Sequence, residues 1–272
     1  MSPTLPQEIL DLIIDLLRDE LSTLKACCLA SKSWILRSRG YMFARVEFSL
    51  TGLRTVESWK KTFPDPPNSP AHHTRNLGLC SANVCAWIRS FRHVEKLSLA
   101  ASGWGGGSLV QLHGLWPTLK SLHLSYIDAP ISEILHLICS FPLLEDLSLH
   151  TLEVNTDEWV TPPTSPKLTG SLRLHGKINS VTRRLLELPD GLHFSEIQVD
   201  YRVGDVSASA VMDLVSKCSG TLETLCLKYQ TSSAFPVVSA AGRLFNPRHP
   251  LIQFCLTYRL RLTSPAPSNS NV

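Results

Sequence analysis

The sequence contains a short apolar pattern that recurs at a fixed interval, and this recurrence limits the possible folds more than any other feature. The pattern is a pair of aliphatic residues separated by one other residue. The pairs recur every 25 residues, and their first members are Leu97, Leu122, Leu147, Leu172 and Ile197. A sixth pair begins at Leu225, after a step of 28 residues. A constant step of this length is typical of chains that stack similar units.

Each pair predicts one short strand. Successive side chains of a strand point to opposite faces, so both aliphatic residues of a pair lie on the same face. Three intervals between the pairs carry apolar residues at helical spacing, which are residues 111–115, 131–138 and 206–215, and residues 181–188 do so more weakly. A strand, a helix and a return to a parallel strand is the simplest way to repeat this pattern. We therefore expect an α/β fold in which neighbouring units bury one another's leucines.

The unit, for example Leu144-Glu-Asp-Leu147-Ser-Leu149, resembles the leucine-rich repeat, whose pattern is L-x-x-L-x-L. The resemblance implies a solenoid with parallel strands on its concave face and helices on its convex face. Residues 45–50 and 75–79 also alternate, and we expect them to form two earlier strands. We assign residues 49–228 to this solenoid.

Residues 1–48 lack the repeat and predict three short helices. The first has Pro6 in its opening turn, where a helix tolerates proline. Ser22 is the expected cap of the second helix, which runs to Leu29. The third lies around Trp34 and is expected to end at Gly40.

The first of these helices carries apolar residues on two faces. Ile9 and Ile13 lie on one side, whereas Leu10 and Ile14 lie on the other. A module of this size buries little surface by itself. Either both faces pack inside this chain, or one of them binds another protein.

Three short patterns in this module resemble the F-box, a three-helix motif that docks on the Skp-type adaptor of cullin–RING ubiquitin ligases. They are the Leu5-Pro6 opening followed by Glu8-Ile9-Leu10, a Leu21-x-x-Leu24-x-x-Cys27 pattern, and a late Ser-Lys-Ser-Trp34. The direct passage from this motif into a strand is similar to F-box proteins of mushroom-forming fungi. The resemblance implies a set of adaptor-facing residues, which are Leu5, Pro6, Ile9, Leu10, Ile13 and Leu24.

The two resemblances together imply a substrate-recognition subunit of a Skp–cullin–F-box ubiquitin ligase, with the repeats holding a protein substrate. Such a chain is not itself an enzyme, because the other subunits carry the chemistry and this one contributes proximity. No Ser–His–Asp arrangement or H-E-x-x-H motif predicts a catalytic site. The alternative is a leucine-rich-repeat interaction scaffold without a ligase role.

The residues between the paired leucines face outward on the predicted strands and form columns at the 25-residue step. We expect the substrate on this concave face, with Arg173 as the anchor and an acidic or phosphorylated segment as its target. The neighbouring candidates are His123, His150, His175 and Gln198. His150, His175 and Asp200 predict a metal site, a binding patch or an ordinary solvated row of polar side chains.

Composition narrows the class of protein further. The net charge is only +3, with Lys and Arg scattered along the chain, so we expect no nucleic-acid partner. The N-terminus shows no charged-then-apolar leader pattern, and no run of 18 apolar residues occurs. We therefore expect a cytoplasmic or nuclear protein without a membrane partner. The eight cysteines form no C-x-x-C pair, so we interpret them as reduced apolar filler and expect no metal or cofactor.

Two segments fall outside the repeat. The glycine-rich residues 102–108 lack the last residues of a phosphate-binding or nucleophile motif, and we interpret them as a loop. Residues 229–272 are expected to be an irregular tail that is incompletely capped or disordered. Either the end of the sequence is truncated or misread, or a last strand near residues 253–258 covers the core imperfectly.

Overall fold

A computed structural model describes ten stretches of the chain, which are residues 6–49, 55–80, 85–100, 104, 107–155, 166–176, 179–189, 191–202, 208–230 and 253–259. The chain divides into two compact units. Unit 1 consists of Met1–Leu144 and Glu153–Val160, and unit 2 consists of Glu145–Leu152 and Thr161–Val272. The domain boundaries expected at residues 48/49 and 228/229 stay predictions.

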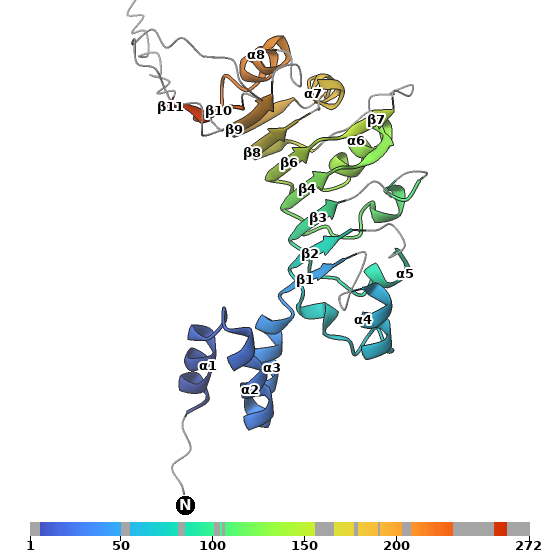
Figure 1. Cartoon of the computed structure of the whole chain (residues 1–272), viewed down its shortest axis with the longest axis vertical. Helices are drawn as coiled ribbons and strands as arrows, with labels where there is room; N and C mark the ends of the chain where they lie inside the picture. Colours follow the sequence, from blue (N-terminus) through green and yellow to red (C-terminus); the bar gives the residue numbers. More distant parts are fainter. Residues whose placement is uncertain are drawn as a thin grey trace, which may run out of the picture. The chain divides into compact units, whose positions relative to one another are not determined.

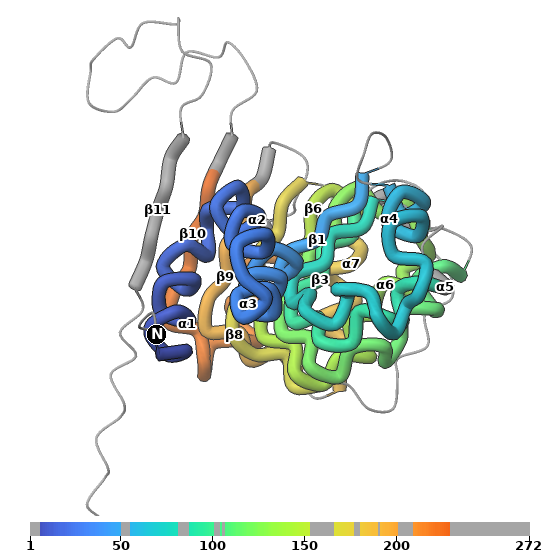
Figure 2. Tube along the Cα trace, turned by 90° about the horizontal axis from the view of Figure 1, so that it is seen from below, coloured from blue at the N-terminus to red at the C-terminus, as the bar shows by residue number. Residues whose placement is uncertain are grey.

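Unit 1 opens with the three expected helices, which are α1 (Gln7–Leu16), α2 (Leu21–Ala30) and α3 (Lys32–Met42). We call them the helical module. Helix α3 packs against both α1 and α2, and Figure 2 shows the three helices gathered together. The second helix begins one residue before Ser22, so Ser22 is not its cap. Glu20 holds that position, and the Thr23 hydroxyl donates to its carboxylate at 2.9 Å.

The prediction that the third helix ends at Gly40 is wrong. Glycine ends a helix by adopting left-handed backbone angles, and Gly40 is not among the residues with positive φ. The helix therefore continues to Met42. At its other end, the Ser31 hydroxyl accepts a hydrogen bond from the Ser33 amide and caps the first turn.

Four parallel strands follow in unit 1, and neighbours in the chain are neighbours in the sheet. They are β1 (Arg45–Phe48), β2 (Asn76–Leu79), β3 (Lys96–Ala100) and β4 (Ser121–Ser125). The helices between and after them are α4 (Val56–Thr62), α5 (Cys85–Ile88) and α6 (Ile131–Cys139), with the short 3₁₀ segments η1 (Pro70–His73) and η3 (Val110–Leu112). Figure 1 shows α4 and α6 along the same side of these strands. A separate parallel pair joins β5 (Asp128–Pro130) to β7 (Glu153–Asn155).

The end of the helical module is fixed to the first strands. The amides of Arg75 and Asn76 both donate to the Ala44 carbonyl at 2.9 Å, and the Thr74 hydroxyl donates to the Phe43 carbonyl at the same distance. The Phe43 ring also packs edge-on against Trp59 of α4, with ring centroids 5.9 Å apart. These contacts join α3, α4 and the start of β2.

Unit 2 repeats the parallel arrangement with β6 (Asp146–His150), β8 (Leu168–His175), β9 (Leu192–Arg202) and β10 (Thr224–Gln230). Its helices are α7 (Asn179–Leu185) and α8 (Ala208–Lys217). The tail that we expected to be irregular contributes β11 (Gln253–Arg259), which pairs with β10. This pair is antiparallel, so β11 is not a further copy of the repeated unit.

The predicted register is confirmed within each unit. In unit 1, Leu97 pairs with Leu122, and in unit 2, Leu147 pairs with Leu172, which pairs in turn with Ile197. All five side chains are buried. The α/β class follows directly from parallel strands, buried aliphatic pairs and intervening helices. Within the described residues, no helix combines the length and apolar character needed to cross a membrane.

A turn of the same kind follows three of the strands. Tyr126, Thr151 and Gly176 come directly after β4, β6 and β8, and each has positive φ. These positions are again separated by 25 residues. A Cβ atom at Gly176 would overlap the Thr151 hydroxyl, so a side chain here would force Thr151 to move, whereas Tyr126 and Thr151 adopt positive φ with side chains of their own.

Candidate protein-interaction surfaces

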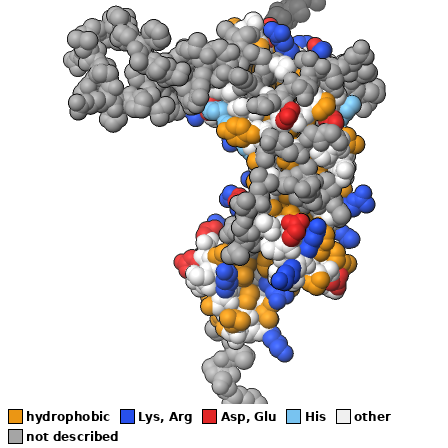
Figure 3. Space-filling view, turned by 45° about the vertical axis from the view of Figure 1, so that its right-hand side comes forward, with side chains coloured by type: hydrophobic (Ala, Val, Ile, Leu, Met, Phe, Trp, Pro, Cys, Tyr) orange, Lys and Arg blue, Asp and Glu red, His pale blue; other side chains and the backbone are white. Residues whose placement is uncertain are grey.

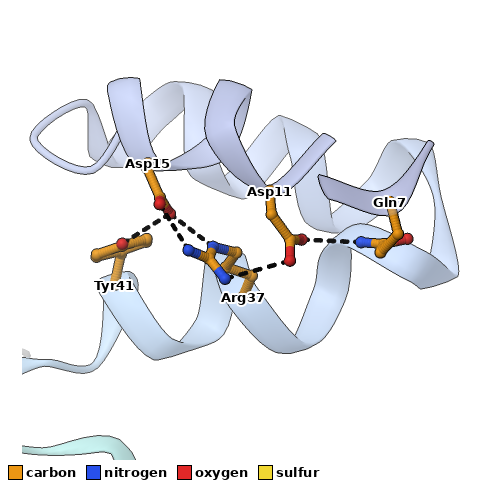
Figure 4. Close-up of polar contacts among 5 residues, drawn as sticks. All are labelled: Gln7, Asp11, Asp15, Arg37 and Tyr41. Carbon is orange, nitrogen blue, oxygen red and sulfur yellow. Dashed lines mark hydrogen bonds and ion pairs between the residues drawn. The ribbon is translucent and has the colours of Figure 1, made fainter. Parts of the chain in front are cut away.

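Helix α1 turns its polar side toward the rest of the helical module. Gln7, Asp11 and Asp15 are spaced four residues apart and share one side of the helix. Figure 4 shows this side facing α3, and between these polar positions only Ile14 is fully buried. A surface helix ordinarily buries its apolar stripe and exposes its charges. Helix α1 departs from this rule, because beside the buried Ile14 it turns the carboxylates of Asp11 and Asp15 toward α3.

The contact between α1 and α3 is a polar network centred on Arg37. Two nitrogens of its guanidinium donate to the two carboxylate oxygens of Asp15, both at 2.6 Å, and Nη1 donates to Asp11 at 3.2 Å. The Tyr41 hydroxyl donates to Asp15 at 2.8 Å, and the Gln7 amide donates to Asp11 at the same distance (Figure 4). The paired geometry between guanidinium and carboxylate fixes the orientation of the helix as well as its distance.

The network changes the acidity of its members. The hydrogen bonds from Arg37, and after them the one from Tyr41, lower the pKa of Asp15 to about 2. The hydrogen bond to Asp15 is also the main reason why the pKa of Tyr41 is raised, and burial adds to it. Asp15 therefore stays charged over the whole neutral and mildly acidic range.

The opposite side of α1 presents a stripe of exposed aliphatic side chains, which we call the apolar stripe. Its members follow the i, i+3, i+4, i+7 spacing of one helix face and are Ile9, Leu12, Ile13 and Leu16. Leu16 is 86% exposed. Among the described residues, seven of the eleven exposed large hydrophobic side chains lie between Ile9 and Leu36. Figure 3 shows hydrophobic side chains on the surface at the end of the molecule that holds these helices.

The predicted adaptor-facing residues divide into three groups. Pro6, Ile9 and Ile13 are exposed and Leu10 is half-buried, so all four are accessible to a partner. Leu24 is only 1% exposed and packs inside the helical module, so it presents no surface. Leu5 lies outside the described residues.

The outward columns of the strands form a second surface, and the strand pairings confirm their predicted membership within each unit. In unit 2, Arg173 lies between Ser148 and Gln198, and His175 lies between His150 and Asp200. Arg173 is exposed and makes no ion pair with any described residue. It is therefore available to an external anion.

The polar side chains next to Arg173 contact one another. The rings of His150 and His175 are stacked, with centroids 4.1 Å apart and planes inclined by 15°. His175 Nδ1 lies 3.7 Å from the carboxylate of Asp200, which also accepts a hydrogen bond from the Gln198 amide at 3.3 Å. The described residues contain no group of three or more His, Cys, Asp or Glu side chains arranged to hold a metal ion.

His123 belongs to unit 1, and the other strand candidates belong to unit 2. It lies on β4 in unit 1, where it pairs with Ser98 of β3, and it is half-buried. Arg173, His175, Gln198 and His150 belong to unit 2. Within unit 2, the structure brings together the other four predicted residues.

The Arg37 network was not predicted from the sequence. Ile9 and Ile13 were placed on one helix face, but which face of α1 is exposed was left open. The network had a signal, because Asp11 and Asp15 share a helix face, as do Arg37 and Tyr41. The stripe was harder to foresee, since a pattern of apolar residues says which of them share a face but not which face is buried.

Comparison with protein-family models gives no match to this sequence, and no curated protein matches it. The basis for a function is therefore the arrangement of the chain's own side chains.

Proposed function

We propose that this chain is the substrate-recognition subunit of a Skp–cullin–F-box type ubiquitin ligase and acts in the cytoplasm or nucleus. In this proposal the helical module is an F-box that docks on a Skp-type adaptor. The parallel strands belong to a leucine-rich-repeat solenoid whose outward columns hold a protein substrate. The chain carries no catalytic residues, and its contribution to ubiquitin transfer is proximity.

The observation that carries the proposal is the reversed orientation of α1. Its polar side is engaged by Arg37, so the helix cannot turn over to bury Ile9 and Ile13 without breaking that network. A contiguous exposed stripe of this kind marks a protein-binding surface. The adaptor-facing residues implied by the F-box resemblance include Ile9 and Ile13, which are members of this stripe.

The repeat supports the second half of the proposal. A solenoid of similar units requires strands at a constant step with their buried leucines in register. The described strands have both features within each unit, and a residue with positive φ follows three of them. Arg173, exposed among His150, His175 and Gln198, is the proposed anchor for an acidic or phosphorylated substrate segment.

An interaction scaffold without a ligase role is the second candidate. Contacts that join the helical module to the first strands favour this candidate, and they link Phe43 and Ala44 to Trp59, Thr74 and Arg75. The terminal cap of a repeat is expected to make contacts of this kind. A scaffold of this kind needs no adaptor.

Adaptor binding by the purified chain separates the two candidates. Ile9→Asp should weaken the binding of a Skp-type adaptor by about a hundredfold or more, because it removes the burial of one large apolar side chain and buries a charge in its place. Met212→Asp is the matched control, since Met212 is also an exposed apolar residue but lies on α8 of unit 2. It should bind like the unmodified chain. If the unmodified chain does not bind the adaptor at micromolar concentration, the ligase proposal is wrong.

A further inference from the structure

Unit 1 contains two pockets that share part of their lining. The first, of about 570 Å³, is lined by Arg37 and Tyr41 of α3, by His72 and His73 of η1, and by Arg75 and His93. The second, of about 350 Å³, is also lined by His72 and His93. Because two side chains belong to both, the pockets adjoin and can receive one ligand.

The lining of both pockets is rich in cationic groups. The second pocket adds Arg89 and Arg92, and no Asp or Glu is among the described residues that line either pocket. Two arginines of the first pocket are already paired, because Arg37 binds Asp11 and Asp15, and Arg75 binds Glu95. Arg89 and Arg92 are exposed and make no ion pair with any described residue. The positive charge of Arg89 and Arg92 is therefore not balanced by an ion pair with any described residue.

The fold gathers these lining side chains from separate parts of the sequence. Arg75 comes directly before β2, and His93 lies shortly before β3. Parallel pairing of β2 with β3 places the starts of both strands at one edge of the sheet. The η1 segment and the last turns of α3 reach the same edge, since Arg75 bonds to Ala44 and Thr74 bonds to Phe43. The ring of His72 is oriented there by a hydrogen bond from Nδ1 to the Ser69 carbonyl at 2.8 Å.

Gly40 lines the first pocket, and no close contact with a described neighbour explains why this position is glycine. Gly40 lies inside α3, where glycine destabilises a helix by about 0.5–1 kcal/mol relative to alanine. Its φ is not positive, and a Cβ atom built on it would meet no atom within 4 Å. No described neighbour therefore requires glycine at this position, whereas a larger side chain would reduce the space in the first pocket.

We propose that the two pockets form a binding site for a phosphate-bearing ligand that carries more than one anionic group. Guanidinium groups bind phosphate oxygens with two parallel hydrogen bonds, and arginines flank both pockets. The combined space lies in the range of small-ligand sites. Trp87, Pro66 and Pro67 also line the second pocket and can contact the uncharged part of the ligand. The proposal does not depend on adaptor docking.

Titration calorimetry on the full chain at constant ionic strength tests the ligand class. The probes are tripolyphosphate, inorganic phosphate, sulfate and a short peptide with two phosphoserines. Tripolyphosphate or the phosphopeptide should bind at least about tenfold more tightly than inorganic phosphate, because either can contact arginines of both pockets. The tighter of the two identifies the source as a free polyphosphate or a phosphorylated chain. If neither binds more tightly than sulfate, the proposal is overturned.

Two sets of variants test the location. The double substitution Arg89→Gln and Arg92→Gln should lower the affinity for the tighter probe by about tenfold or more, whereas Arg183→Gln on α7 of unit 2 should not change it. Gly40→Glu should lower the affinity and Gly40→Ala should preserve it, with both variants folded as judged by thermal melting. Equal affinity of the double variant and the unmodified chain would overturn the proposed site. Adaptor binding by the Arg89 and Arg92 variant should be unchanged, so failure of this site is distinguishable from failure of the proposed function.

Discussion

The helical module and the repeated strands place their side chains in opposite ways. On the strands, aliphatic residues such as Leu172 are buried and polar residues such as Arg173 face solvent. On α1, the aliphatic residues Ile9 and Leu16 face solvent, while Asp15 is held against α3 by Arg37. The strands follow the ordinary rule of a soluble fold, and α1 breaks it.

The buried residues of the strands stabilise the fold, whereas the exposed aliphatic residues of α1 are accessible to a partner. The strands gain stability from burial, and substitutions in their apolar positions should act on folding. The apolar stripe of α1 contributes little to folding, because its side chains are solvated in this chain. Substitutions there should act on binding. Adjacent residues of one strand or helix, one buried and the other exposed, allow this difference to be measured.

The largest effect is expected on β8. Leu172 is fully buried, so Leu172→Ala should lower the free energy of unfolding by about 2–5 kcal/mol through lost burial and the cavity that remains. Its neighbour Arg173 is exposed, and Arg173→Glu should change stability by no more than about 0.5 kcal/mol. Chemical denaturation of both variants measures the contrast. Equal stability of Leu172→Ala and the unmodified chain would contradict the register of the repeat.

A smaller contrast is expected within α1. Ile14 is fully buried and Ile13 is 39% exposed. Ile14→Ala should cost about 2 kcal/mol or somewhat more, the lower end of the range for buried aliphatic residues, because the module is small. Ile13→Ala should cost clearly less. Hydrogen exchange of the α1 amides reports the local stability of both variants. A larger loss for Ile13→Ala than for Ile14→Ala would mean that the apolar stripe is the buried side of the helix.

The smallest effect concerns pH. The pKa of Asp15 is lowered from its ordinary 3.8 to about 2 in the folded chain, so Asp15 stabilises the fold above about pH 4. Its contribution is lost as the pH falls from about 4 toward 2, where the carboxylate takes up a proton. The difference in unfolding free energy between the unmodified chain and Asp15→Asn should be constant from pH 5 to 7 and should shrink below about pH 4. A difference that is independent of pH would show that the Arg37 network contributes nothing as an ion pair.

The sequence was sufficient to predict the repeated part of the fold. A constant step and period-two alternation determine both the strand direction and the residues that share a face, and the pairs of Leu147 with Leu172 and of His150 with His175 follow from them. The helices between strands were predictable only where apolar spacing is strong, as in α6. The interval at residues 111–115, where a helix was expected, forms only the short η3 segment.

The candidate sites were less predictable, and the reasons are physical. Whether Leu24 faces a partner depends on how two helices are rotated against each other, and the structure shows that it is buried. The antiparallel direction of β11 has no signal in an alternating pattern, because alternation is the same in both directions. Residues that line the two pockets, such as Arg37, His72 and Arg92, are far apart in the sequence and belong to no local motif, so they could not be grouped in advance.

Arg37 contacts α1 and also lines the first pocket, so ligand binding at one of the two proposed surfaces would affect binding at the other. One side of its guanidinium holds Asp15 and Asp11, and the same residue lines the first pocket. If both proposed ligands bind, an anion that draws hydrogen bonds from Arg37 would weaken its bonds to Asp15 and Asp11 and so loosen α1. A protein that holds α1 would keep Arg37 bound to these carboxylates and away from the anion. Thermodynamic linkage makes such antagonism reciprocal, so each ligand would lower the affinity of the other by the same factor.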